Sequence, residues 1–299
     1  MVRVWLALVL AVVVASCAPQ RAAAPEREAQ KAWLNLAGGT IGERFQVPQG
    51  FERVEVSEGS FAHYLRNLPL KPHGSEVRYY DGRVKPNAGA YEAVVQMDIG
   101  TRDLQQCADA VMRLRAEYLY GQGRFNEIWF EFANGFRAEY AKWMEGYRIW
   151  VEGNTCRWVK RSWKSNNYTS FREYLDMVFA YANTVSLRRQ LVPVAVNEVW
   201  IGDVFVDQGH AVIVVDLARD RVTGKKLIIL AQSYMPAQEI HVLANQVNQG
   251  LSPWFEADFG DALVTPEWTF RRADLRRFPS GWPLQGGCCQ TRLDERCLR

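Results

Sequence analysis

The chain has 299 residues, of which 48% are hydrophobic and 23% charged, which is ordinary for a globular protein. Its net charge of +3 includes no Lys/Arg-rich block, so the sequence lacks the basic stripe typical of nucleic-acid-binding proteins. We therefore expect no nucleic-acid partner, and the length is sufficient for one domain with a sizeable core.

The N-terminus resembles a bacterial lipoprotein signal peptide. Arg3 precedes the apolar segment 5–14, which is too short to cross a bilayer. The following Val14-Ala15-Ser16-Cys17 is similar to a lipobox, and that resemblance implies that Cys17 is lipidated and becomes the first mature residue. Because Ala18 rather than Asp follows the cysteine, it further implies an outer-membrane anchor that faces the periplasm. An ordinary secretory peptide that happens to contain a cysteine is the alternative.

The remaining chain divides by composition. An Ala-rich, charged stretch that ends near Gly38-Gly39 is typical of a flexible linker. We expect a signal peptide (1–16), a flexible tether (17–44), a single α+β domain (45–279) and a Cys-rich C-terminal tail (280–299).

The hydrophobic periodicity predicts a mixed chain. Helices are expected at 61–65 after Ser60, at about 104–120, at 136–145 and from a capping box at Ser170 onward. Strands are expected at 76–80, 91–99, 125–132, 147–151, 193–201, 203–206, 210–217 and 226–232. Because helices precede a strand-rich last part, we predict an α+β fold with an antiparallel sheet.

The predicted helix 104–120 carries a cysteine near its start. Asp103 is the expected N-cap with Gln106 in capping-box position, and Gly121 is the expected stop. The apolar stripe consists of Leu104, Cys107, Val111, Leu114 and Tyr118. The positive end of the helix dipole is expected to lower the pKa of the Cys107 thiol. A buried core cysteine is the alternative interpretation.

His210 opens the predicted strand 210–217, directly after Gly209. A cysteine on a helix followed by a histidine on a strand is the layout of papain-like hydrolases, in which the histidine acts as the base. Antiparallel pairing around the loop 218–224 brings Gln232, or Ser233 after a one-residue slip, opposite His210. Either side chain could orient the imidazole, or it could simply be a polar residue at a strand end.

Other polar residues have a weaker pattern. Asp98 and Asp103 flank Gly100 and could line a binding cleft, although a turn and a helix cap are the favoured explanation. His241 could reach the same cleft. The sequence shows neither zinc-ligand spacing nor a phosphate-binding loop, so we expect no cofactor and no metal site.

The cysteine count leaves one thiol over. Apart from Cys17, the chain contains Cys107, Cys156, Cys288, Cys289 and Cys297. Disulfides within the C-terminal tail, with or without Cys156, would leave Cys107 free. A Cys107–Cys156 disulfide is the alternative, and it would exclude a catalytic thiol.

Several segments are similar to a bacterial lipoprotein family of unknown function (DUF4846-like) over roughly residues 45–278. They include Ser60-Phe61-Ala62, Leu68-Pro69-Leu70-Lys71-Pro72, Asp103 to Ala110, Gly209-His210-Ala211-Val212, Ala231 to Gln238 and Thr265-Pro266-Glu267-Trp268.

The order of elements also distantly resembles the NlpC-type and CHAP-type papain-like cysteine amidases and peptidases. That resemblance implies that Cys107 is the nucleophile, His210 the base and Gln232 the orienting residue. We therefore expect a lipid-anchored cysteine amidase or peptidase that acts on envelope peptide or amide bonds, for example in peptidoglycan. The alternative is a non-catalytic envelope lipoprotein that binds glycan or protein partners through an aromatic cleft.

Overall fold

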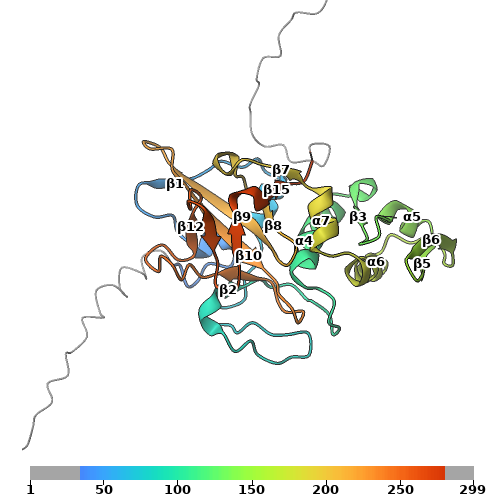
Figure 1. Ribbon diagram of the computed structural model, residues 1–299. Helices are drawn as coiled ribbons and strands as arrows, with labels where there is room; N and C mark the ends of the chain where they lie inside the picture. Colours follow the sequence, from blue (N-terminus) through green and yellow to red (C-terminus); the bar gives the residue numbers. More distant parts are fainter. Residues whose placement is uncertain (1–33, 280–299) are drawn as a thin grey trace, which may run out of the picture.

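The computed structural model of the protein describes residues 34–279 (Figure 1). The expected signal peptide, the expected lipidation site Cys17 and the tail cysteines Cys288, Cys289 and Cys297 lie outside the described residues. Cys107 and Cys156 are both free thiols, so the alternative of a disulfide between them is wrong.

A long antiparallel hairpin forms the centre of the domain. Strand β9 (Ala211–Asp220) pairs with β10 (Lys226–Gln232), and both cross the middle of Figure 1. The residues of β9 from 211 to 218 are all buried, because other elements cover both faces of the hairpin. At the turn, the Asp220 carboxylate accepts the backbone N–H groups of Val222 and Thr223. The predicted strand 226–232 is confirmed to the residue.

Shorter strands extend this hairpin into a nine-stranded sheet, in the order β2-β11-β10-β9-β8-β15-β7, with β1 beside β9 and β12 beside β10. All pairings in it are antiparallel. The added strands are β1 (Phe51–Arg53), β2 (Tyr91–Val94), β7 (Val192–Pro193), β8 (Val204–Val206), β11 (His241–Leu243), β12 (Trp254–Glu256) and β15 (Leu275–Arg277). The fold is therefore mixed α+β with a mainly antiparallel sheet, as predicted.

Two expected strands are wrong. The segment 193–201 contributes only β7, because the chain then turns into the 3₁₀ helix η3 (Val196–Glu198). The segment 76–80 makes only isolated bridges, at Arg78 and Tyr79. Neither segment has a neighbouring strand along its full length. An alternating hydrophobic pattern forms a strand only where such a neighbour is present to pair with it.

Three helices pack against β9: α2 (Ile41–Arg44), α3 (Phe61–Arg66) and α4 (Cys107–Gly121). The predicted cap of α3 is confirmed, since the Ser60 hydroxyl accepts the N–H of His63 (3.1 Å). The expected tether ends too late, because Ile41 is fully buried in the core and belongs to the domain.

Helix α4 begins later than predicted. Its N-cap is Gln106, and the Asp109 carboxylate accepts the Gln106 N–H (3.0 Å) in a reciprocal capping box. Asp103 is not the N-cap, because its carboxylate accepts the N–H of Ala237 instead (2.6 Å). Cys107 is consequently the first helical residue, where the backbone N–H groups are not used within the helix.

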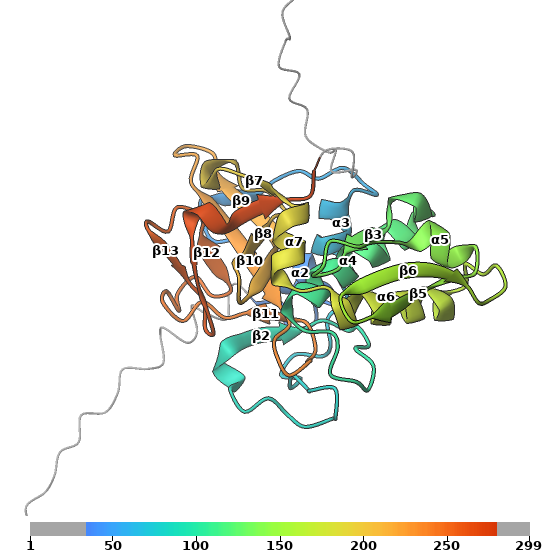
Figure 2. The ribbon, with the colours of Figure 1, turned by 45° about the vertical axis from the view of Figure 1, so that its right-hand side comes forward.

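A second group of elements lies beside α4, away from the main sheet, on the right of Figure 2. It comprises η2 (Phe125–Glu127), β3 (Trp129–Glu131), β4 (Arg137–Glu139), α5 (Tyr140–Met144), β5 (Tyr147–Glu152), β6 (Thr155–Lys160) and α6 (Tyr168–Tyr181). Helix α7 (Thr184–Gln190) lies between this group and the sheet, where Arg188 donates to the carbonyl oxygen of Val206 in β8. The predicted helix 136–145 is a strand followed by a short helix, and α6 begins before Ser170, at the N-cap Asn167.

The hairpin of β13 (Ala262–Val264) and β14 (Thr269–Arg271) lies at the other side of the sheet, at the left of Figure 2. The chain also forms η1 (Ala88–Ala90) and η4 (Arg272–Asp274). Among residues 34–279, no helix combines the length and the apolar character that a membrane crossing requires.

Candidate functional site

Cys107 lies where α4 meets the start of β9. Backbone N–H groups near its sulfur, those of Ala108 and Cys107 in its own helix and that of Ala211, the first residue of β9, favour the thiolate and act to lower its pKa. Burial and the nearby Asp109 nevertheless raise the pKa of Cys107 to about 11. The expected lowering by the helix dipole is wrong, because the desolvation of a thiolate here outweighs the N–H groups that favour it.

His210 immediately precedes β9 and is only 1% exposed. Its backbone N–H donates to the Asp207 carboxylate (2.8 Å), and its carbonyl accepts the Asp207 N–H (3.1 Å). Burial lowers the pKa of His210 to about 4, so the imidazole is neutral at pH 7. A hydrogen-bonded loop therefore places an uncharged histidine directly before Ala211, whose backbone N–H lies near the Cys107 thiol.

Aromatic rings surround this imidazole. Ring centroids of Tyr234, Trp268 and Phe270 lie 4.7, 5.5 and 5.9 Å from that of His210. The Trp268 indole N–H donates to the same carboxylate of Asp207 that holds the His210 loop (2.9 Å). The rings fix the plane of the imidazole and exclude water from most of it.

Gln232 reaches His210 as the sequence predicts, although by a different register. The pairing shifts between Ile229 and Leu230, so that Ala231 faces Ile213 and Gln232 is diagonal to His210 rather than opposite it. Diagonal neighbours share a face of the sheet. The two side chains are hydrogen-bonded, with 2.8 Å between His210 Nε2 and Gln232 Oε1.

Ser233 does not replace Gln232. Its buried hydroxyl donates to the carbonyl oxygen of Gln238 (2.6 Å), within the loop that follows β10. His241, in contrast, does reach the site, because β11 pairs beside β10 with His241 opposite Gln232. The distance from His241 Nε2 to Gln232 Nε2 is 3.3 Å.

The structure favours structural roles for the two aspartates before α4. The exposed carboxylate of Asp98 pairs with Arg172 (3.1 Å). Asp103 accepts N–H groups from Ala237 and from the Gln106 side chain (3.1 Å). Within residues 34–279, neither aspartate hydrogen-bonds Cys107, His210 or Gln232.

Four further residues of the site are not singled out by sequence reasoning: Lys85, Asp207, Glu267 and Trp268. The carboxylate of Glu267 accepts from Gln232 Nε2 (2.7 Å) and from Lys85 Nζ (2.6 Å). Glu267 and Trp268 are adjacent in a segment that carries the family resemblance. That resemblance could have identified them as candidate site residues from the sequence. Lys85 lies in an irregular loop and has no local pattern.

The described part of the chain lacks two further features at this site. No hydrogen bond links the Cys107 thiol directly to the His210 imidazole within residues 34–279. The same residues contain no group of three or more His, Cys, Asp or Glu side chains that could hold a metal ion.

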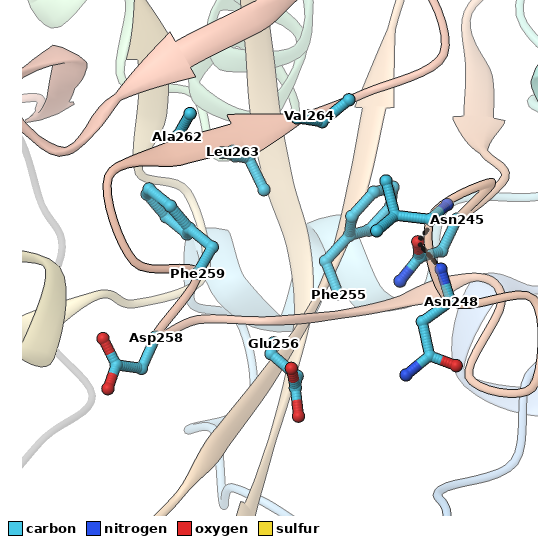
Figure 3. A pocket seen from close by; sticks show the side chains of 10 residues that line it. Asn245, Asn248, Phe255, Glu256, Asp258, Phe259, Ala262, Leu263 and Val264 are labelled. Atoms are coloured by element: carbon cyan, nitrogen blue, oxygen red, sulfur yellow. Dashed lines mark hydrogen bonds between the residues drawn. The ribbon is translucent and has the colours of Figure 1, made fainter.

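A separate pocket of about 210 Å³ opens between β12 and β13 (Figure 3). Phe255 and Phe259 form apolar walls, while the carboxylates of Glu256 and Asp258 lie along one side. The other lining residues are Asn245, Val247, Asn248, Ala262, Leu263 and Val264. Aromatic walls with carboxylates and amides at the rim suit a polar ligand that has apolar faces.

Comparison with curated proteins found no match. Comparison with solved structures also found none. A family model, described as "Domain of unknown function (4846)", matches residues 41–277, from α2 to β15, and thus includes Cys107, His210 and Gln232. The chain belongs to this family.

Proposed function

We propose that the protein is a cysteine-dependent amidase or peptidase that cleaves peptide or amide bonds of the cell envelope, such as those of peptidoglycan. Cys107 is the nucleophile, His210 the base and Gln232 the residue that orients the base. One observation carries the proposal. Gln232 is hydrogen-bonded to Nε2 of His210, which leaves Nδ1 for a thiol that lies near the backbone N–H of the very next residue, Ala211.

The resting pair is uncharged in this proposal, since burial raises the pKa of Cys107 and lowers that of His210. As Sγ attacks the scissile carbonyl carbon, His210 Nδ1 takes the thiol proton, so charge develops only with bond formation. The protonated imidazole then gives this proton to the leaving amine, and a thioester remains on Cys107. Water, deprotonated by the same nitrogen, hydrolyses the thioester to the acid and restores the thiol.

The arrangement of elements supports the papain-like interpretation. The nucleophile begins helix α4, the base immediately precedes β9, and the orienting amide ends β10. We further propose that Cys17 carries the lipid anchor and that the domain faces the periplasm from the outer membrane, as the lipobox resemblance implies.

The experiment is digestion of purified peptidoglycan by the full chain, with the muropeptides separated by chromatography and identified by mass. Cys107→Ala and His210→Ala should each abolish new fragments, whereas Cys156→Ala, which removes the other free thiol of the described chain, should not. Fragments that persist in folded Cys107→Ala protein, or that never form with wild type, would overturn the proposal.

A second candidate function is non-catalytic binding of envelope glycan, and the pocket between β12 and β13 favours it. In this pocket the ring of Phe259 would stack on a sugar ring, and the carboxylate of Glu256 would accept hydrogen bonds from the sugar hydroxyls. Co-sedimentation with peptidoglycan that is lost in Phe259→Ala but kept in Cys107→Ala, without any cleavage by wild type, would support binding instead of hydrolysis.

A further inference from the structure

A chain of buried polar contacts lies behind His210. Lys85 Nζ is 2.6 and 2.8 Å from the two carboxylate oxygens of Glu267. Glu267 Oε2 is 2.7 Å from Gln232 Nε2, and Gln232 Oε1 is 2.8 Å from His210 Nε2. Lys85, Gln232 and His210 are all buried, so each contact must satisfy its partner without help from bulk water.

The direction of the Gln232 amide determines which ring nitrogen of His210 carries the proton. One end of the amide only donates hydrogen bonds and the other only accepts them. A carboxylate only accepts, so the end 2.7 Å from Glu267 must be the NH₂ group. The reversed amide would place two acceptor oxygens in contact at a buried site, with no compensating donor.

His241 supplies a second, independent constraint on the same amide. Its Nδ1 is 2.8 Å from the backbone carbonyl of Glu239 and must donate to it, which leaves Nε2 as an acceptor in the neutral ring. That acceptor is 3.3 Å from Gln232 Nε2. Burial lowers the pKa of His241, so the ring is neutral near pH 7, and it too requires the NH₂ end of Gln232 on its side.

We infer that Glu267, held in place by Lys85, is a positioning residue that selects the tautomer of His210. With the NH₂ group of Gln232 directed at Glu267, its oxygen must face His210, so His210 Nε2 carries the proton and Nδ1 carries the lone pair. The tautomer assignment stands on these contacts alone. Only its consequence, a lone pair available to deprotonate Cys107, rests on the proposed function.

The test is the ¹⁵N NMR spectrum of the full chain with labelled histidine, which distinguishes a protonated from an unprotonated ring nitrogen. Wild-type His210 should be Nε2-protonated. In Glu267→Gln the charged acceptor is lost and the new amide can present either end to Gln232, so that only the neutral His241 still favours the wild-type direction of the Gln232 amide. The ratio of the Nε2–H to the Nδ1–H form should therefore fall by about tenfold. An unchanged ratio in folded Glu267→Gln protein would overturn the inference.

Two further variants keep the test decisive. Glu239→Gln is the matched control, because the Glu239 side chain pairs with Lys71 and not with Gln232, and its backbone carbonyl remains. Its tautomer ratio should match that of wild type. If Glu267→Gln unfolds, Lys85→Met combined with Glu267→Leu removes both charges of the pair together and should shift the tautomer in the same direction. A folded double variant with the wild-type ratio would again overturn the inference.

Peptidoglycan digestion separates this inference from the proposed function. A tautomer shift in Glu267→Gln, together with no hydrolysis by wild type, would refute the hydrolase while supporting the positioning role. Hydrolysis by wild type with no tautomer shift would do the reverse. If both hold, kcat of Glu267→Gln should fall with little change in KM, whereas Glu239→Gln should retain both.

Discussion

Gly209 passes so close to the indole of Trp268 that a Cβ at this position would lie 2.7 Å from the ring carbons. The glycine before His210 is therefore explained by packing, since its backbone does not adopt a left-handed conformation. The contact presses the His210 loop against the β13–β14 hairpin, whose connection carries both Trp268 and Glu267. The loop that holds His210 and the segment that carries Glu267 are thereby linked.

Gly209→Ala should displace either Trp268 or the His210 loop, and it should lower the free energy of unfolding by roughly 1–3 kcal/mol. Chemical denaturation measures this loss. Gly121→Ala is the matched control, because a Cβ at the end of α4 meets no atom within 4 Å. Equal stabilities of the two variants would contradict the close contact seen here.

Leu114→Ala tests the packing of α4 on the sheet. Leu114 is completely buried in the core, so its truncation should cost roughly 2–5 kcal/mol in unfolding free energy. Leu36→Ala, at a largely exposed side chain, should change stability by less than about 0.5 kcal/mol. A cost well below 1 kcal/mol at Leu114 would show that this face of α4 is not in the core.

Acid should destabilise the fold through its buried histidines, of which His210 has the more clearly lowered pKa. The folded-state pKa of His210 is about 4, below the ordinary value of 6.5, so the unfolded state binds more protons between these values. Stability should therefore be greatest above pH 6.5 and fall as the pH decreases toward 4, by at most roughly 3 kcal/mol from this residue. Denaturation curves of His210→Asn should show a shallower decline over the same pH window. If the stability of His210→Asn declined as steeply as that of wild type, the acid sensitivity would come from other titratable groups.

The reactivity of the Cys107 thiol should follow its burial. With a pKa of about 11, Cys107 should react with iodoacetamide at pH 7 at least about a hundredfold more slowly than a model thiol. The rate should rise nearly tenfold per pH unit up to about pH 11, as read by mass spectrometry of the labelled peptide. Rapid labelling at pH 6–7 would instead indicate a thiolate stabilised in the resting protein.

The lipobox resemblance predicts that mature protein sediments with membranes and carries acyl chains on Cys17. Cys17→Ser should remain unprocessed or become soluble, because the thiol that accepts the lipid is lost. Fractionation and intact mass measure this outcome. Wild-type protein that is free of lipid mass in the periplasmic fraction would contradict it.

Sequence reasoning reached the α+β class, the helix that carries Cys107, the strand that directly follows His210 and the strand that ends at Gln232, because these elements have strong local patterns. The stripe of α4 and the apolar runs of β9 and β10 each fit one secondary structure only. The secondary structure predicted for weakly patterned segments such as 136–145 and 193–201 is wrong, because their conformation depends on neighbours distant in the chain.

The pairing of Gln232 with His210 followed from sequence only in part. Alternation placed both side chains on one face of the hairpin, which the structure keeps. The register shift between Ile229 and Leu230 then decided which residues of β9 and β10 lie opposite each other. No feature of the local sequence predicts this shift. The shift skips one residue, Val215, and thereby brings Gln232 level with Val212, whose side chain lies on the same face of the sheet as that of His210.

The sequence by itself thus determined the secondary structure of the candidate site and the chemical types of its three central residues. Only the tertiary structure decided their electrostatics. Burial reversed the expected direction of the Cys107 pKa, and the Lys85–Glu267 pair reached Gln232 from loops far away in the chain. Desolvation and long-range contacts depend on what surrounds a residue in space, whereas periodicity and capping depend on its neighbours in sequence.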